Sequence, residues 1–353
     1  MFMDYKTLAT LQLTVLQRLA EQVGNTPLQS ISLLIDGYER KIHLKLEGEN
    51  PTGSMKDRTG YALIQHQEKL GKLHSGSIIV ESTSGNLGVA LALQCKAKGY
   101  RFIAVIDPKT TQENIVKMQT LGAQLELVDQ ADATGGYLLT RLARIQALCA
   151  DDPNCIWTCQ YASQANPYIH YSSTGPEIYR QMDGHVDAVL IPVSTGGTLA
   201  GVGRFFREVS PSTRIIGVDA YGSVVFGTPP APRKLTGIGS SQPSNFITTQ
   251  LYDDYILVND IDAFAYCHAL QTKTNLKVGG SSGATLAACT RYLAAHPELR
   301  RVVCLCADRG ENYASSIFNA EWICQQHLDI SQAVRDALCH ISAETALVAT
   351  ISS

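Results

Sequence analysis

The sequence lacks an excess of charge of either sign, and this narrows the class of partner it is expected to bind. Its 29 lysine and arginine residues stand against 32 aspartate and glutamate residues, and no long run of like charge occurs. Electrostatic attraction to nucleic acid or to an anionic membrane is therefore not expected. The sequence also lacks an apolar stretch of transmembrane length and an N-terminal segment of basic and then apolar residues. We expect a cytoplasmic protein that binds small molecules and other subunits.

The sequence also lacks cysteines at the spacing of metal ligands, although the chain has ten cysteines. They are scattered through apolar runs, and Cys155 and Cys159 have no second pair at zinc-finger spacing. Cytosolic thiols are normally kept reduced, so disulfides are not expected either. The sequence predicts that the cysteines pack in the core and that the protein has no metal site.

Short apolar segments alternate with amphipathic ones along most of the chain. The expected strands are residues 77–80, 102–106, 124–128, 188–192, 215–218 and 302–305. The expected helices are residues 87–99, 114–121, 137–148 and 198–208. Strands that alternate with helices of this length predict an α/β protein with mainly parallel sheets flanked by helices, arranged as two domains. Ligands in such folds bind where strands run into helix N-termini.

Two loops at such positions have the composition of anion sites. Ser82, Thr83, Ser84 and Asn86 follow one strand and can surround a carboxylate with hydroxyls and backbone N–H groups. The segment Ser194-Thr195-Gly196-Gly197-Thr198 follows another strand and suits a phosphate, because glycine permits close approach and the helix dipole favours an anion. A helix cap rich in serine and threonine is the alternative for either loop taken alone. Neither loop continues as a Walker motif or as a full dinucleotide fingerprint.

A lysine occupies a third junction of this kind. Lys56 lies in Gly53-Ser54-Met55-Lys56-Asp57-Arg58, between a glycine turn and an expected helix, where a lysine can be held against a bound aldehyde. An ordinary helix N-terminus is the alternative for this segment by itself. Ser281 lies in a further glycine-rich segment, residues 279–284, that leads into a helix.

Five motifs, taken in their order along the chain, allow these junctions to be interpreted together. They are GSMKDR, TSGN, QYASQANP with TGPEI, STGGT and GGSSGA. In this order the chain resembles the cysteine synthase and cystathionine β-synthase family of fold-type II pyridoxal-phosphate enzymes, over roughly residues 23–325. The resemblance implies a fold like that of the tryptophan synthase β subunit and pyridoxal 5'-phosphate as cofactor. It also implies a homodimer that acts on small amino-acid substrates.

The resemblance implies roles for individual residues. Lys56 would form the internal aldimine and Asn86 would bond the ring hydroxyl oxygen. Ser281 would meet the pyridine nitrogen. The cofactor phosphate would be held by Ser194, Thr195, Gly196, Gly197 and Thr198. The substrate carboxylate would be held by Ser82, Thr83, Ser84 and Gln160. A serine at the ring nitrogen makes the ring a weaker electron sink than a carboxylate would, which favours β-elimination, and the freed amine of Lys56 is the natural base.

Departures from ordinary cysteine synthases carry the substrate information. The chain has Leu87 and Ser194 at positions where those enzymes commonly have threonine and glycine. The segments 135–141, 218–227 and 308–313 are more specific. In them the chain resembles the branch of the family that makes N-(2-amino-2-carboxyethyl)-L-glutamate, a precursor of 2,3-diaminopropionate in siderophore pathways. That branch eliminates phosphate from O-phospho-L-serine and adds the amine of L-glutamate to the aminoacrylate intermediate.

Our hypothesis is that Arg141, Tyr161 and Ser194 form the anion pocket that separates this branch from sulfide users. A guanidinium can bind a phosphate or a second carboxylate with two parallel hydrogen bonds. On spacing alone, Arg141 is a solvated helix residue one turn from Tyr137.

Two other functions stay open, and the domain boundaries are an expectation. One is a cysteine synthase that uses O-acetylserine or O-phosphoserine with sulfide, and the other is a catalytically silent regulatory homologue. We expect residues 1–56 and 160–325 to form a large cofactor-binding domain. Residues 57–159 would form a small mobile substrate domain, and residues 326–353 a helical tail.

Overall fold

The computed structural model describes residues 5–131 and 136–348, and the chain divides into two compact units. Unit 1 comprises the described residues up to Gly24 and the segment Asn50–Ala165. Unit 2 comprises Asn25–Glu49 and the described residues from Asn166 onward. We expected residues 1–56 and 160–325 to form the large domain, but this division places the described residues up to Gly24, residues 50–56 with Lys56, and residues 160–165 in unit 1, the smaller one.

Unit 1 is built around a parallel sheet. Its strands are β3 (Ile78–Ser82), β4 (Arg101–Ile106), β5 (Gln124–Leu127) and β6 (Cys155–Trp157). They form a four-stranded sheet in the order β5-β4-β3-β6, and every neighbouring pair is parallel. Its helices are α1 (Tyr5–Glu21), α2 (Lys56–Lys69), α3 (Asn86–Lys98), α4 (Gln112–Thr120) and α5 (Leu138–Asp151).

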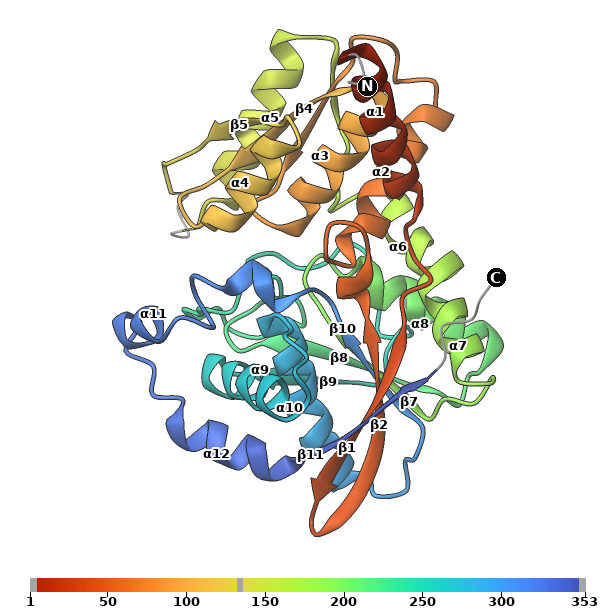
Figure 1. Ribbon diagram of the computed structural model, residues 1–353, viewed down its shortest axis with the longest axis vertical. Helices are drawn as coiled ribbons and strands as arrows, with labels where there is room; N and C mark the ends of the chain where they lie inside the picture. The colour runs from red at the N-terminus through yellow and green to blue at the C-terminus, as the bar shows by residue number, and fades with distance from the viewer. Residues whose placement is uncertain (1–4, 132–135, 349–353) are drawn as a thin grey trace. The chain divides into compact units, whose positions relative to one another are not determined.

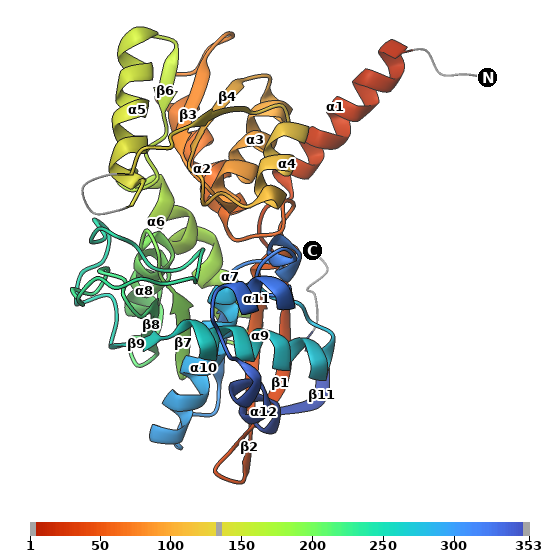
Figure 2. The same cartoon turned by 90° about the vertical axis from the view of Figure 1, so that its left-hand side faces the viewer.

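Alternation of side chains along β3 and β4 explains why helices cover both faces of this sheet. Ile79 and Ala104 pack in a core with residues of α2, α3 and α4. Ile78 and Ile103 point to the opposite face, where they pack with Ile145 of α5. Figure 2 shows α5 on one side of the strands and α3 and α4 on the other. Both faces are buried, which is why these strands are almost continuously apolar.

Unit 2 contains a larger, mixed sheet. Its strands are β1 (Leu28–Ile35), β2 (Tyr38–Leu46), β7 (Ala188–Pro192), β8 (Arg214–Ala220), β9 (Asp254–Val258), β10 (Val302–Cys306) and β11 (Ile341–Val348). The order is β11-β1-β2-β10-β7-β8-β9. The pairs from β2 to β9 are parallel, whereas β1 is antiparallel to both β2 and β11.

Helices flank the unit 2 sheet as well. They are α6 (Ala165–Ile169), a π-helical turn (His170–Thr174), α7 (Gly175–Gln181), α8 (Gly197–Val209), α9 (Asp260–Thr274), α10 (Gly280–Ala295), α11 (Ala320–Gln325) and α12 (Ser331–His340). Short 3-10 turns occupy Glu47–Glu49 and Gly310–Tyr313. Ala188 and Leu190 of β7 face a core with α9 and α10, while Val189 and Ile191 face one with α7 and α8. Figure 1 shows these two helix layers on opposite sides of the strands.

The predicted α/β class is confirmed, and one expectation about the C-terminus is wrong. Residues 188–192 form β7 as expected, and the other predicted strands are present with shifted ends. The tail after residue 326 is not purely helical, because β11 follows α12 and pairs with β1, with Val348 opposite Leu28. The residues after 348 lie outside the described part.

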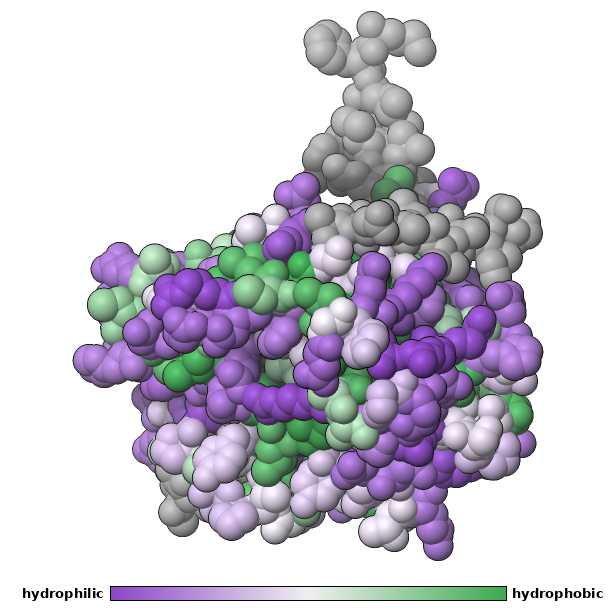
Figure 3. Space-filling view, turned by 90° about the horizontal axis from the view of Figure 1, so that it is seen from below, coloured by the Kyte–Doolittle hydropathy of each residue, from purple (hydrophilic) through white to green (hydrophobic). Residues whose placement is uncertain are grey.

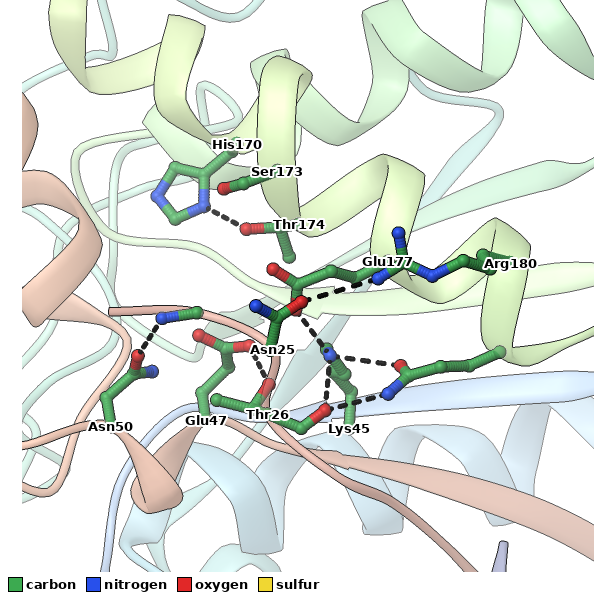
Figure 4. Close-up of polar contacts among 12 residues, drawn as sticks. Asn25, Thr26, Lys45, Glu47, Asn50, His170, Ser173, Thr174, Glu177 and Arg180 are labelled. Carbon is green, nitrogen blue, oxygen red and sulfur yellow. Dashed lines mark hydrogen bonds and ion pairs between the residues drawn. The ribbon is translucent and has the colours of Figure 1, made fainter. Parts of the chain in front are cut away.

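A buried polar network links the first strands of unit 2 to α7. The fully buried amine of Lys45 donates to the carbonyl oxygen of Thr26 at 2.6 Å, to Glu177 Oε2 at 2.7 Å and to Gln181 Oε1 at 3.0 Å. The hydroxyl of Thr26 donates to Glu47 Oε1 at 2.7 Å. These contacts are drawn in Figure 4. Since a buried charge is tolerated only when it is paired and hydrogen-bonded, the network fixes how α7 meets this sheet.

Substituting Thr26 with valine tests the contribution of this network to stability. We expect Thr26→Val to lower the free energy of unfolding by about 1–3 kcal/mol, because the buried Glu47 carboxylate loses a donor that valine cannot replace. Chemical denaturation monitored by circular dichroism measures the change. Thr272→Val is the matched control, because that hydroxyl is exposed and bonds only within α9. Equal stability of the two variants would contradict the prediction.

One face of the protein is mainly hydrophilic (Figure 3). On this face hydrophobic residues form small separate patches. Within residues 5–131 and 136–348, no helix combines the length and the hydropathy needed to cross a bilayer. Six of the cysteines are buried, among them Cys304 and Cys306 in β10, whereas Cys324 and Cys339 are exposed. Core packing therefore accounts for most of the cysteines but not for these two.

Candidate active site

Lys56 is the first residue of α2. The turn that precedes it is stabilised by hydrogen bonds to the side chain of Asp57. Asp57 Oδ2 accepts hydrogen bonds from the backbone N of Thr52 at 3.1 Å and from its hydroxyl at 2.9 Å. Burial lowers the pKa of Lys56 to about 8, and the negative charge of Glu81 partly opposes this. A lysine with a pKa this near neutrality has a substantial population of neutral, nucleophilic amine at physiological pH.

Ser82 ends β3, Thr83 and Ser84 lie in the loop that follows, and Asn86 begins α3. Ser82 and Thr83 are buried, and the Thr83 backbone N donates to the Val105 carbonyl at 3.1 Å. The Ser82 hydroxyl is buried and has no hydrogen-bond partner among the residues that the structure describes. Gln160 Nε2 donates to the Ser82 carbonyl at 3.0 Å. The fold therefore brings Gln160 to this loop, although 78 residues separate it from Ser82.

Arg141 is buried, so its interpretation as a solvated helix residue is wrong. It lies on α5 with 8% of its surface exposed and forms an ion pair with Asp107, Nε to Oδ2, at 3.4 Å. Its Nη1 atom is buried without a hydrogen-bond partner among the described residues. Burial raises the pKa of Tyr161, and the positive charge of Arg141 opposes that shift. Unit 1 therefore brings Arg141 and Tyr161 into electrostatic contact. Gly135, in the segment that precedes α5, lies outside the described residues.

In unit 2, the segment Ser194–Thr198 follows β7 and includes the first two residues of α8. Gly196 has φ +89°, and a Cβ there would lie 2.1 Å from the Ser244 hydroxyl. A Cβ on Gly197 would lie 2.3 Å from Asn166 Oδ1. Only glycine fits at these positions, and the segment leads into the N-terminus of a 13-residue helix, where the helix dipole favours an anion. Such a segment suits a phosphate.

Residues of α6 and of the π-helical turn make polar contacts with the segment Ser194–Thr198. Asn166 Nδ2 donates to the Thr195 hydroxyl at 3.2 Å, and the Thr198 hydroxyl lies 3.3 Å from His170 Nε2. The Ser194 hydroxyl donates to the Gly239 carbonyl at 3.1 Å. Sequence reasoning assigned no role to His170. A buried histidine beside threonines in the segment 170–174 was the available signal.

Ser281 lies in the first turn of α10. It is 1% exposed, and its hydroxyl has no hydrogen-bond partner among the residues that the structure describes. Because buried hydroxyls are normally hydrogen-bonded, this one is available to a ligand atom. Sequence analysis had noted its glycine-rich segment, and the family resemblance implied its role.

Sequence reasoning missed two buried carboxylates of unit 1. Glu81, next to last in β3, is fully buried and accepts four hydrogen bonds. Asp107, just after β4, pairs with Arg141. A carboxylate at the carboxyl end of an apolar strand was the available signal in both cases. Among the described residues, no group of three or more His, Cys, Asp or Glu side chains is placed to hold a metal ion.

Comparison with known proteins gives a consistent family match. Residues 19–308 match the family model described as pyridoxal-phosphate dependent enzyme. A relative from Ralstonia nicotianae named N-(2-amino-2-carboxyethyl)-L-glutamate synthase is 40% identical over 309 residues, which cover 88% of this chain and 91% of the relative. One of the same name from Cupriavidus metallidurans is 37% identical over 312 residues, covering 88% of this chain and 92% of that relative.

Solved structures of related enzymes have a similar fold. A hydrogen sulfide-producing enzyme from Fusobacterium nucleatum aligns with a TM-score of 0.78 at 30% identity, covering 84% of this chain and 98% of that one. An O-acetylserine dependent cystathionine beta-synthase from Helicobacter pylori aligns with a TM-score of 0.77, also at 30% identity, covering 84% of this chain and 97% of that one.

Proposed function

The chain belongs to the pyridoxal-phosphate dependent enzyme family, and we propose that it makes N-(2-amino-2-carboxyethyl)-L-glutamate and phosphate from O-phospho-L-serine and L-glutamate. Its cofactor is pyridoxal 5'-phosphate, and its reaction class is β-replacement. The observation that carries the proposal is the pair of relatives of that name, each of which matches 88% of the chain.

The residues present fit the cofactor. Ser281 has a buried hydroxyl that can pair with the pyridine nitrogen. The segment Ser194–Thr198 offers backbone N–H groups for the phosphate, and the Cβ contacts at Gly196 and Gly197 explain why it must be glycine-rich. Lys56 supplies an amine for the aldehyde, and Asn86 an amide for the ring hydroxyl oxygen. When bound, the cofactor supplies an electron sink for the electrons of the substrate Cα–H bond.

Lys56 is the proposed proton carrier. Its lowered pKa of about 8 lets the amine take the α-proton of the substrate and keep it on Nζ until the product is formed. Ser281 is neutral and cannot hold a proton on the pyridine nitrogen as a carboxylate would. This limits how much negative charge the ring accepts, which favours loss of the β-substituent.

The substrate sites follow from unit 1. We propose that Ser82, Thr83, Ser84 and Gln160 hold the α-carboxylate, since Gln160 is already bonded to the Ser82 carbonyl. The leaving phosphate and the second substrate need positive charge, which we assign to Arg141 with Tyr161 and Ser194. In the overall reaction the Cβ–O bond breaks, phosphate leaves with the electron pair, and the glutamate nitrogen forms the new Cβ–N bond and loses one proton.

Product analysis tests the function. The holoenzyme is incubated with O-phospho-L-serine and either L-glutamate or sulfide, and phosphate release and product mass are measured. We expect fast phosphate release with glutamate and a product of the mass of N-(2-amino-2-carboxyethyl)-L-glutamate. Faster turnover with sulfide, from O-phosphoserine or O-acetylserine, would make the protein a cysteine synthase, which is the second candidate. No turnover with any pair would identify a silent homologue.

Uptake of the cofactor should depend on pH through Lys56. Only the neutral amine attacks an aldehyde, so the rate at which apoenzyme takes up pyridoxal phosphate should rise with pH and level off above about 8, the pKa of Lys56. Stopped-flow absorbance measures this rate. Lys56→Arg serves as the control, because a guanidinium stays protonated and should abolish the covalent phase. A wild-type rate that keeps rising to pH 10 would show an unshifted lysine.

Three further properties are part of the same proposal. We infer a cytoplasmic homodimer whose product is a precursor of 2,3-diaminopropionate in siderophore biosynthesis. Size-exclusion chromatography with light scattering tests the dimer.

A further inference from the structure

Glu81 lies where the hydrogen-bond ladder between β3 and β6 ends. The ladder pairs Ile78 with Cys155 and Val80 with Trp157, and the Thr158 backbone N reaches the Val80 carbonyl at 3.4 Å. Beyond this point the side chain of Glu81 makes the connection between the two segments. It is fully buried, and nothing in the reaction described above uses it.

Each oxygen of the Glu81 carboxylate accepts two hydrogen bonds. Oε1 accepts from the Ser82 backbone N at 2.9 Å and from Trp157 Nε1 at 3.2 Å. Oε2 accepts from the Thr158 hydroxyl at 2.6 Å and from the Gln160 backbone N at 3.1 Å. Three of the four donors are fixed N–H groups, which favour the ionised carboxylate. Burial nevertheless raises the pKa of Glu81, and these hydrogen bonds oppose the shift.

The segments that Glu81 joins are those assigned to the substrate. Ser82 opens the loop proposed to hold the α-carboxylate, and Gln160 contributes to the same site. Gln160 also donates through Nε2 to the Ser82 carbonyl at 3.0 Å, so the side chain and the backbone of Gln160 are tied to one strand end. A shift of the Glu81 carboxylate would therefore move Ser82 and Gln160 together.

The charge of Glu81 also acts on the ionisable groups around it. On α2, it raises the pKa of Lys56 against the larger effect of burial. In the segment after β6, it adds to the burial effect that raises the pKa values of Cys159 and Tyr161. Arg141 acts on Tyr161 in the opposite direction. Asp107 in turn pairs with Arg141.

We propose that Glu81 is a positioning residue of the reaction, whose carboxylate fixes Ser82 and Gln160 in one arrangement and whose negative charge favours the protonated form of Lys56. The proposal rests on the proposed function for its catalytic meaning. A single buried carboxylate thereby couples the substrate-carboxylate site to the protonation of the amine proposed to carry the α-proton.

The effect of the Glu81 charge on Lys56 is tested on the full-length apoprotein, without cofactor or substrate. The pKa of Lys56 is measured by NMR titration of ¹³C-lysine, with the resonance assigned from Lys56→Arg. We expect Glu81→Gln to lower the pKa of Lys56 below the wild-type value of about 8, because the charge that stabilises the ammonium is gone. Glu126→Gln is the matched control, since it removes a carboxylate of unit 1 that pairs with Arg144. An unchanged pKa in a folded Glu81→Gln variant would overturn the proposal.

A second variant separates position from charge. Glu81→Asp keeps the charge but withdraws the carboxylate from its donors by one methylene. We expect the pKa of Lys56 to stay near the wild-type value while KM for the amino-acid substrate rises about tenfold. If KM is unchanged, the positioning role is wrong.

Should Glu81→Gln fail to fold, Thr158→Val is the substitute. It removes one of the donors that favour the ionised Glu81 carboxylate, so it is expected to lower the pKa of Lys56 by less than Glu81→Gln would. No shift there would likewise count against the proposal. Because the titration needs neither substrate, its failure is distinct from a failure of the proposed function.

Discussion

Replacing Lys56 with alanine should lower kcat by at least about 10³-fold, with O-phosphoserine and glutamate as substrates. The variant loses both the amine proposed to attach the cofactor and the base proposed for the α-proton. Initial rates of phosphate release measure the effect. Mass spectrometry after borohydride reduction should find the cofactor on the Lys56 peptide of the wild type and not on this variant.

Lys98→Ala is the matched control for this experiment. Lys98 lies in unit 1 as well, but its amine pairs with Glu68 near the surface, at 2.8 Å. We expect wild-type kcat and a wild-type label on Lys56. Substantial turnover by Lys56→Ala, or a reduced cofactor attached to another lysine, would show that the family motif has been assigned to the wrong residue.

Replacing Arg141 with alanine should lower kcat/KM for O-phosphoserine by about 100-fold, the size expected when one member of a buried charge pair is truncated. Arg141 is buried and holds a guanidinium nitrogen, Nη1, without a protein acceptor among the described residues. With O-acetylserine, whose leaving group does not need the same positive charge, the loss should be smaller. Steady-state kinetics with both donors measure the difference.

Two controls separate recognition from stability in the Arg141 experiment. Arg144→Ala removes the next arginine on α5, which pairs with Glu126 at 2.8 Å and is partly exposed, and it should leave both rates unchanged. Arg141→Ala also leaves Asp107 without its ion pair, so Asp107→Asn in the same background should restore stability but not the rate with O-phosphoserine. Equal losses with both donors would mean that Arg141 has only a structural role.

Local sequence predicted the parts of the fold whose signal lies within a few residues. Residues 188–192 are continuously apolar and bounded by turn residues, and they form β7 as predicted. Strand β11 was missed because its partner β1 is more than 300 positions away, with Val348 opposite Leu28. Strand β9 was missed as well, since Asp254–Val258 is short and half-exposed at the edge of the sheet. No local pattern encodes such long-range pairing.

The same division applies to the candidate site. Lys56, Asn86, the segment Ser194–Thr198 and Ser281 were selected as candidate site residues from short motifs, because a turn into a helix needs particular small residues at fixed spacing. Taken together in their order along the chain, these motifs are also sufficient to indicate the family and the cofactor.

The sequence by itself determined the α/β class, the family and the cofactor, and it proposed the candidate residues of the local motifs, because each of these depends on neighbours within one turn or one strand. Only the tertiary structure decided that Arg141 is buried against Asp107, that Glu81 ties Ser82 to Gln160, and that the pKa of Lys56 is lowered. The physical reason is that burial and charge depend on groups brought together from segments 25 to 79 residues apart. Desolvation and Coulomb interactions follow distance in space and not distance along the chain.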